Sequence, residues 1–149
     1  MDLTSQIRGA ALVLLGQREH SRRELLGKLS DKFNLPVDAS ELQQCLARLA
    51  KDGYQSDERF AEVFVRSRKA RGYGPVFIEQ ELRRRGLEVS LVVESVRRSD
   101  AGWLSLADEV KRKKFGAGLV TAWQEKAKVA RFLQYRGFLP LQIDGALRG

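Results

Sequence analysis

A motif that returns about every 50 residues is the feature that most constrains the fold of this chain. It is a pair of apolar residues four positions apart, which places both side chains on one face of a helix. The pair occurs three times: Leu25 and Leu29, Ile78 and Leu82, Val129 and Leu133. The copies lie 53 and 51 residues apart. Recurrence at such a period predicts tandem copies of one supersecondary unit.

The middle copy shows how each helix of this kind begins and ends. Pro75 follows Gly74 and suits the first position of a helix, where its missing N–H costs nothing. Gly86 is a helix stop. The ending Arg85-Gly86 is repeated at Arg136-Gly137, whereas the first copy has Phe33-Asn34 in this place.

The composition favours helix and an interior without disulfides. The chain of 149 residues is 43% hydrophobic and 8% aromatic, with three prolines, and it is rich in Leu, Arg, Glu and Ala. Its one cysteine, Cys45, excludes an intramolecular disulfide and fits a reducing cytosol. No apolar run approaches the roughly 20 residues that span a bilayer. We therefore expect a cytoplasmic protein without a membrane partner.

The apolar stripes divide each copy into helix–turn–helix–turn–helix. We expect an all-α fold with three three-helix repeats, at residues 1–52, 53–100 and 101–149. A unit this small buries its own apolar face poorly, so the repeats should stack into an elongated, curved array. No linker rich in Pro, Gly or Ser separates them.

Several helix starts are predicted from capping residues. Ser21 with Glu24 forms a capping box, in which each side chain accepts a hydrogen bond from the other residue's N–H. By the same reasoning the other starts are predicted at Asp38, at Ser56 or Asp57, and at Thr121.

The net charge of +8 is unevenly distributed. Residues 1–52 contribute +1, residues 53–100 contribute +2 and residues 101–149 contribute +5. Basic residues in a last helical turn favour the helix dipole, but runs of three or four exceed that need. We expect these runs to contact a polyanion or an acidic protein surface. The candidate contact residues are Arg66, Arg68, Lys69, Arg71, Arg83, Arg84, Arg85, Lys111, Arg112, Lys113, Lys114, Lys126, Lys128, Arg131 and Arg136.

A catalytic centre is not indicated. The chain has one histidine, His20, one cysteine and no metal-ligand spacing. Gly72-Tyr-Gly-Pro lacks the Lys-Ser or Lys-Thr of a phosphate-binding loop. We expect a protein that is not an enzyme and needs no cofactor or metal.

Four motifs, in this order, resemble the signatures of the RecX family over about residues 7–147. They are Ser21-x-x-Glu24-Leu25-x-x-Lys28-Leu29, Gly53-Tyr54-x-x-Asp57-x-Arg59-Phe60-Ala61, Gly74-Pro75-x-x-Ile78-x-x-Glu81-Leu82-x-x-x-Gly86 and Arg131-Phe132-Leu133-x-x-Arg136-Gly137-Phe138. In one of them, Gln55 occupies a place where the resemblance leads us to expect an apolar residue.

The resemblance implies a cytoplasmic, all-helical regulator of the RecA recombinase, built from three tandem three-helix repeats. It implies binding along the groove of RecA–DNA filaments, with inhibition of strand exchange, ATP hydrolysis and coprotease action. We expect a monomer that also makes weak, non-specific contact with DNA.

A stand-alone helical DNA-binding module is the alternative, since three-helix units with basic ends resemble helix-turn-helix proteins in outline. Against it, the basic residues are spread over all three repeats instead of concentrated on one recognition helix. Salt-sensitive contact with phosphates is compatible with both hypotheses.

Overall fold

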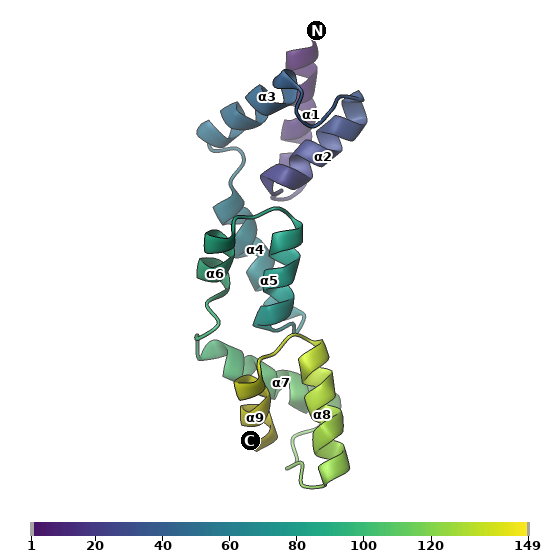
Figure 1. Ribbon diagram of the computed structural model, residues 1–149, viewed down its shortest axis with the longest axis vertical. Helices are drawn as coiled ribbons and strands as arrows, with labels where there is room; N and C mark the ends of the chain where they lie inside the picture. The colour runs from purple at the N-terminus through teal and green to yellow at the C-terminus, as the bar shows by residue number, and fades with distance from the viewer. Residues whose placement is uncertain (1, 149) are drawn as a thin grey trace.

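The computed structural model describes residues 2–148, and every regular element in that range is a helix. Figure 1 shows three groups of three helices stacked along one long axis, with α1 at one end and α7, α8 and α9 at the other. The all-α fold of three-helix repeats in an elongated array is confirmed. The helices are α1 (Leu3–Gln17), α2 (Arg22–Phe33), α3 (Ser40–Lys51), α4 (Asp57–Ala70), α5 (Pro75–Arg84), α6 (Val89–Val96), α7 (Gly102–Phe115), α8 (Trp123–Tyr135) and α9 (Pro140–Arg148).

We call the three groups unit 1 (α1–α3), unit 2 (α4–α6) and unit 3 (α7–α9). Within each unit the helices pack closely on one another. The exact repeat boundaries at residues 52 and 100 stay a prediction.

Two of the predicted helix starts are confirmed. The Ser21 hydroxyl accepts a hydrogen bond from the Glu24 N–H, and the Glu24 carboxylate accepts one from the Ser21 N–H. Ser56 caps α4 by accepting from the N–H of Arg59.

The predictions at Asp38 and Thr121 are wrong. The N–H of Ala39 donates to the carbonyl of Pro36, so the chain turns once more before α3 begins at Ser40. The N-cap is therefore Ala39, one residue beyond Asp38. In the same way Ala122 takes the place expected for Thr121, and neither helix has a side-chain cap.

The buried side chains form two separate cores. The α1–α3 core lies within unit 1, whereas units 2 and 3 share a continuous one that includes Phe60, Leu82, Trp103 and Leu133. Unit 1 therefore has no common apolar core with its neighbour.

Polar contacts join unit 1 to unit 2 instead. Gln55 is buried, and its amide donates to the carboxylate of Asp57 at 3.0 Å and to the carbonyl of His20 at 3.3 Å. The same carboxylate accepts the N–H of Arg22 at 2.9 Å. A polar residue fits this place because its hydrogen bonds are made across the junction.

The repeated Arg-Gly ending lies at the junctions between units. The N–H of Gly74 donates to the carbonyl of Arg136 at 2.8 Å, which joins the start of α5 to the end of α8. The corresponding contact between units 1 and 2 joins the start of α2 to the end of α5: the hydroxyl of Ser21 donates to the carbonyl of Arg85 at 2.8 Å. In each Arg-Gly ending, the arginine carbonyl thus accepts a hydrogen bond from the start of the second helix of the preceding unit.

The first copy of the repeat lacks the Arg-Gly ending and has Phe33-Asn34 there. Its second helix, α2, ends at Phe33 with Asn34 as the C-cap. Asn34 adopts the left-handed conformation there, with φ of 52°. Asparagine tolerates this region better than most residues do.

Candidate functional site: a cationic groove between α4, α7 and α8

A groove with a volume of about 570 Å³ lies where the ends of α4 and α7 meet the second half of α8. We call it the cationic groove, because five cations and one acid line it: Lys69, Arg71, Lys113, Lys114 and Arg136, with Glu109. Leu106, Val110 and Phe132 supply apolar walls. The groove lies between units 2 and 3, which share one core.

Arg136 is held in a defined orientation in this groove. It is half-buried, and its Nη1 donates to the carbonyl of Arg71 at 2.9 Å. The guanidinium carbon lies 5.0 Å from the ring centre of Tyr73 and 5.2 Å from that of Phe132. Since a guanidinium has five N–H donors, donors remain for a carboxylate or a phosphate.

The end of α7 supplies the second part of the groove. The ammonium of Lys114 lies 5.0 Å from the centre of the Phe132 ring, and Phe115 packs edge-on against the same ring at 5.5 Å. Lys113 is exposed beside it. Phe132 therefore orders cations from both α7 and α8 around one apolar surface.

Two other predicted contact residues, Arg68 and Arg85, make their contacts within the protein. The guanidinium carbons of Arg68 and Arg85 lie 4.2 and 4.6 Å from the ring centre of Phe64, in a hollow of about 280 Å³ between units 1 and 2. Arg85 also pairs with Glu81 at 2.7 Å and with Glu24 at 3.6 Å. Burial, helped by the nearby charges of Arg71 and Arg85, lowers the pKa of Arg68. Of the two, Arg85 joins unit 2 to unit 1 through Glu24, and Arg68 packs beside it on the Phe64 ring.

Three of the predicted residues on α4 and α5 do not line the groove: Arg66, Arg83 and Arg84. Arg83 is exposed at the end of α5, and Arg84 pairs with Glu81 at 3.1 Å. Arg66 lines a second hollow together with Glu62, and Lys69 lines both this hollow and the groove. The ammonium of Lys69 lies 4.4 Å from the centre of the Trp103 ring.

Lys111 departs from the expected exposed run. It is 1% exposed, and its ammonium donates to the carbonyl of Gly118 at 3.2 Å. The helical period explains this, because Lys111 follows buried Ala107 by four residues on the inner face of α7. Its neighbour Arg112 is exposed and pairs with Asp108 at 3.0 Å.

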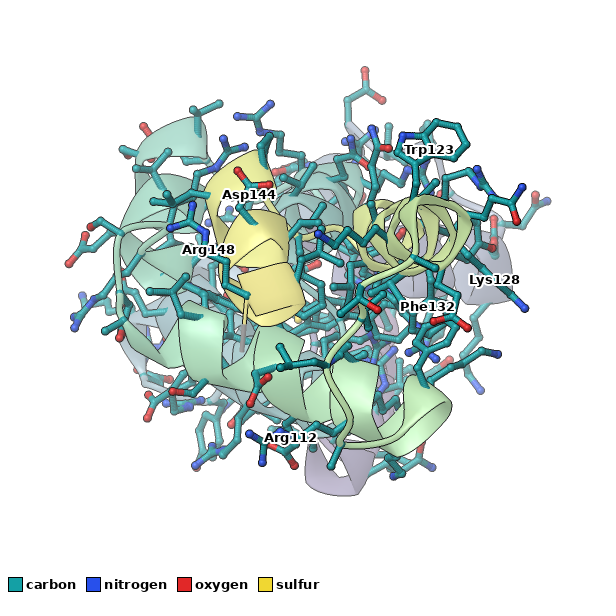
Figure 2. All side chains as sticks on the ribbon, turned by 90° about the horizontal axis from the view of Figure 1, so that it is seen from below. Arg112, Trp123, Lys128, Phe132, Asp144 and Arg148 are labelled. Carbon is teal, nitrogen blue, oxygen red and sulfur yellow. The ribbon has the colours of Figure 1, made fainter. Side chains whose placement is uncertain are left out.

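The last three predicted residues, Lys126, Lys128 and Arg131, are exposed on α8. In the view of Figure 2, Lys128 points outward from α8, whereas Phe132 points toward α7. Lys128 is a neighbour of Phe132 on the helix surface, one turn earlier, and it is exposed. The positive charge of the groove therefore continues along α8.

Aromatic residues are the part of the site that sequence reasoning missed. Tyr73 and Phe132 order Arg136 in the groove, and Trp123 and Tyr135 stand exposed at the two ends of α8. A signal was available: Phe132 and Arg136 lie four residues apart, and so do Lys128 and Phe132.

This arrangement is suited to non-covalent binding of anionic groups. Within residues 2–148, the acidic, histidine and cysteine side chains form no group of three or more that could hold a metal ion. Each helix of this part of the chain is too short or too polar to cross a bilayer. What the groove offers is charge-assisted hydrogen bonds beside apolar walls.

Models of two RecX domains match this chain. The second three-helix domain matches residues 56–94, and the third matches residues 104–147. These matches cover most of units 2 and 3.

Similar proteins agree with these matches. A protein named regulatory protein RecX from Halorhodospira halophila is 44% identical over 140 residues, which cover 94% of this chain and 85% of that protein. One of the same name from Escherichia coli O1:K1 / APEC is 35% identical over 145 residues, covering 93% and 87%.

Solved structures show the same fold. A crystal structure of RecX from Lactobacillus salivarius superposes with a TM-score of 0.81 at 17% identity, covering 97% of this chain and 94% of that one. A second, of a regulatory protein RecX, gives 0.79 at 18% identity, covering 96% and 70%. With two domain models matched and close relatives along nearly its whole length, this chain belongs to the RecX family of regulatory proteins.

Proposed function

We propose that this protein binds RecA–DNA filaments and inhibits the recombinase, which lowers strand exchange, ATP hydrolysis and coprotease action. Membership of the RecX family supports a regulatory role, and the resemblance of its motifs supports RecA as the partner. The observation that carries the proposal is the cationic groove, where helices from two units bring cations together in an elongated array.

The proposed mechanism is occupation of the filament without chemistry by this chain. The stacked units extend along one axis, so the array can contact more than one subunit of a helical filament. Arg136, Lys113 and Lys114 then bind DNA phosphates or an acidic recombinase surface. A cytoplasmic monomer is part of this proposal.

A stand-alone DNA-binding module is the second candidate, favoured by the exposed cations Lys128 and Arg131 on α8. It differs from the first in what it needs: a duplex sequence, but no recombinase. Tight binding to one duplex sequence at physiological salt would support this candidate, whereas non-specific binding that falls steeply with salt agrees with the filament proposal.

The test measures the single-stranded-DNA-dependent ATPase and strand exchange of RecA with the wild-type protein and two double variants. Lys113→Glu with Lys114→Glu reverses charge in the groove. Lys32→Glu with Lys51→Glu makes the same net change at exposed sites in unit 1. The matched charge change separates local contact from long-range electrostatic attraction.

We expect the groove variant to lose most of its inhibition while the unit 1 variant retains it. Leu82→Ala, which removes a fully buried side chain, should cost roughly 2–5 kcal/mol and lower activity only as far as it unfolds the protein. Full inhibition by a groove variant that melts normally would show that these cations are solvated helix ends. Absence of any effect of the wild-type protein on RecA would contradict the function itself.

A further inference from the structure

A ridge on the outside of α8 combines exposed aromatic rings with cations. Residues four apart along a helix form such a ridge, and here they are Trp123, Ala127, Arg131 and Tyr135. Lys128 lies beside it. In Figure 2, Trp123 and Lys128 both project from α8 away from the rest of unit 3.

The two rings at the ends of the ridge are open to solvent. Trp123 is 80% exposed and Tyr135 is 83% exposed, whereas Trp103 in the same unit is fully buried and donates its indole N–H to the carbonyl of Arg97 at 2.9 Å. Trp123 and Tyr135 are thus available to a ligand, and they contribute little to the core.

The cations between these rings are also free to bind. Among residues 2–148, Lys128 and Arg131 have no hydrogen bond or ion pair within the protein. The acid of this helix, Glu125, lies off the ridge. Unlike Arg85 or Arg112, these two side chains have no carboxylate to neutralise them.

We propose that the α8 ridge binds single-stranded nucleic acid, with bases stacked on Trp123 and Tyr135 and backbone phosphates on Lys128 and Arg131. Aromatic rings interleaved with cations are the usual surface for single strands, because every base presents a face for stacking. A duplex hides those faces. Trp123 and Tyr135 are twelve positions apart, a rise of about 18 Å along the helix, so the rings hold separate bases of one strand.

This inference deepens the proposed function and rests on it for biological meaning, since a recombinase filament forms on a DNA strand. It concerns a different surface from the cationic groove. Its test therefore needs no recombinase.

The experiment titrates the full chain with a 20-nucleotide oligothymidylate, an abasic strand of equal length and a 20-base-pair duplex at low salt. The anisotropy of a dye attached to each strand gives the affinity for every variant, including Trp123→Ala. In the proteins that keep Trp123, tryptophan fluorescence also reports the contact, because Trp103 is buried and Trp123 is open. The variants are Trp123→Ala, Tyr135→Ala and Lys128→Gln with Arg131→Gln. Leu141→Ala, which removes an exposed apolar side chain from α9, is the matched control.

We expect the oligothymidylate to quench the fluorescence of Trp123 and to bind more tightly than the abasic strand or the duplex. Each aromatic variant should weaken oligothymidylate binding on the order of tenfold and leave abasic binding unchanged. The double cation variant should weaken binding of both strands, and the Leu141 variant should match the wild type. Unchanged circular dichroism and melting confirm that the variants are folded.

Three results would overturn the proposal. Equal affinity for the oligothymidylate and the abasic strand would show binding through phosphates alone. A duplex preference would exclude base stacking, and self-association that Trp123→Ala abolishes would make the ridge an interface between copies. If the protein inhibits RecA but does not bind single strands, this inference fails and the proposed function stands. If it binds single strands but does not inhibit RecA, this inference stands and the proposed function fails.

Discussion

Gly74 and Gly137 meet backbone to backbone at the junction of units 2 and 3. A β-carbon on Gly74 would lie 2.5 Å from both the carbonyl carbon and the carbonyl oxygen of Gly137. A β-carbon on Gly137 would lie 2.5 Å from the backbone nitrogen and the β-carbon of Phe77. Side chains at either position would separate the N–H of Gly74 from the carbonyl of Arg136. The junction therefore requires glycine on both sides.

Alanine substitutions at Gly74 and Gly137 should separate the free-energy cost of the steric clash from the cost of backbone strain at positive φ. Gly74 has an ordinary φ of −91°, so Gly74→Ala tests the close approach alone and should cost about 1–3 kcal/mol. Gly137 has a φ of 95°, so Gly137→Ala adds backbone strain and should cost about 2–5 kcal/mol.

Gly53→Ala is the control for backbone strain, because Gly53 has a φ of 84° and nothing within 4 Å of an added β-carbon. It should cost about 1–2 kcal/mol. Chemical denaturation measures all three free energies. A Gly74 variant as stable as the wild type would mean that the junction yields easily.

Lys111 and Lys113 should respond differently to the same substitution. Lys111→Glu removes the donor to the Gly118 carbonyl and buries a carboxylate in its place, at a cost on the order of 3–5 kcal/mol. Lys113→Glu, two residues away on the exposed side, should change stability by under about 0.5 kcal/mol. Thermal melting compares the two, and equal melting temperatures would mean that Lys111 reaches solvent.

Unit 1 should unfold separately from units 2 and 3. Its core is separate and smaller, and its junction with unit 2 is polar. Both tryptophans lie in unit 3, so fluorescence follows the buried Trp103 while far-UV circular dichroism follows every helix. In urea, the dichroism transition should begin before the fluorescence transition. Coincident transitions would show that the polar junction makes the three units one cooperative structure.

Acidification should destabilise unit 1 through His20. Burial lowers the pKa of His20, and the positive charges of Arg18 and Lys28 act in the same direction, although the hydrogen bond to the carbonyl of Arg18 and the charge of Glu24 oppose them. The Nδ1 of His20 donates to the Arg18 carbonyl at 3.0 Å, and its Nε2 accepts from the ammonium of Lys28 at 2.9 Å. This arrangement needs a neutral ring, because an ammonium only donates.

The sign follows from a folded pKa below the unfolded value of about 6.5. Above pH 6.5 the stabilisation is complete, and it falls as the pH drops from 6.5 toward the folded pKa, since the unfolded chain binds the proton more readily. Melting temperatures between pH 7.5 and 5 should decline, and His20→Gln should flatten the decline. A similar decline in both proteins would assign the effect to other groups.

Local sequence determined the elements and their repetition. Pro75 starts α5, Gly86 adopts the left-handed conformation after it with a φ of 83°, and Ser21 forms its capping box with Glu24. Each of these signals acts within a few residues, so the sequence is enough to find them. The errors at Asp38 and Thr121 are one-residue shifts of helix start. At Asp38 the shift is caused by the turn that the Ala39 N–H and the Pro36 carbonyl close.

Which of the predicted contact residues are exposed and unpaired could not be predicted from the local sequence. The run from Lys111 to Lys114 looked uniform, but α7 turns Lys111 inward and leaves Lys113 exposed. Buried Glu79 pairs with Arg98 through two hydrogen bonds of 2.7 and 2.8 Å across 19 residues, and no pattern predicted it. Which charge is paired depends on residues brought close by packing.

The sequence by itself determined the helices, the three copies and the repeated Arg-Gly ending, because helical period and turn chemistry are local. Only the tertiary structure decided what that ending does: the carbonyls of Arg85 and Arg136 accept hydrogen bonds from the start of the second helix of the preceding unit. It also decided that units 2 and 3 share a core and a cationic groove. These features join residues up to 65 positions apart, and their contacts exist only after the units stack.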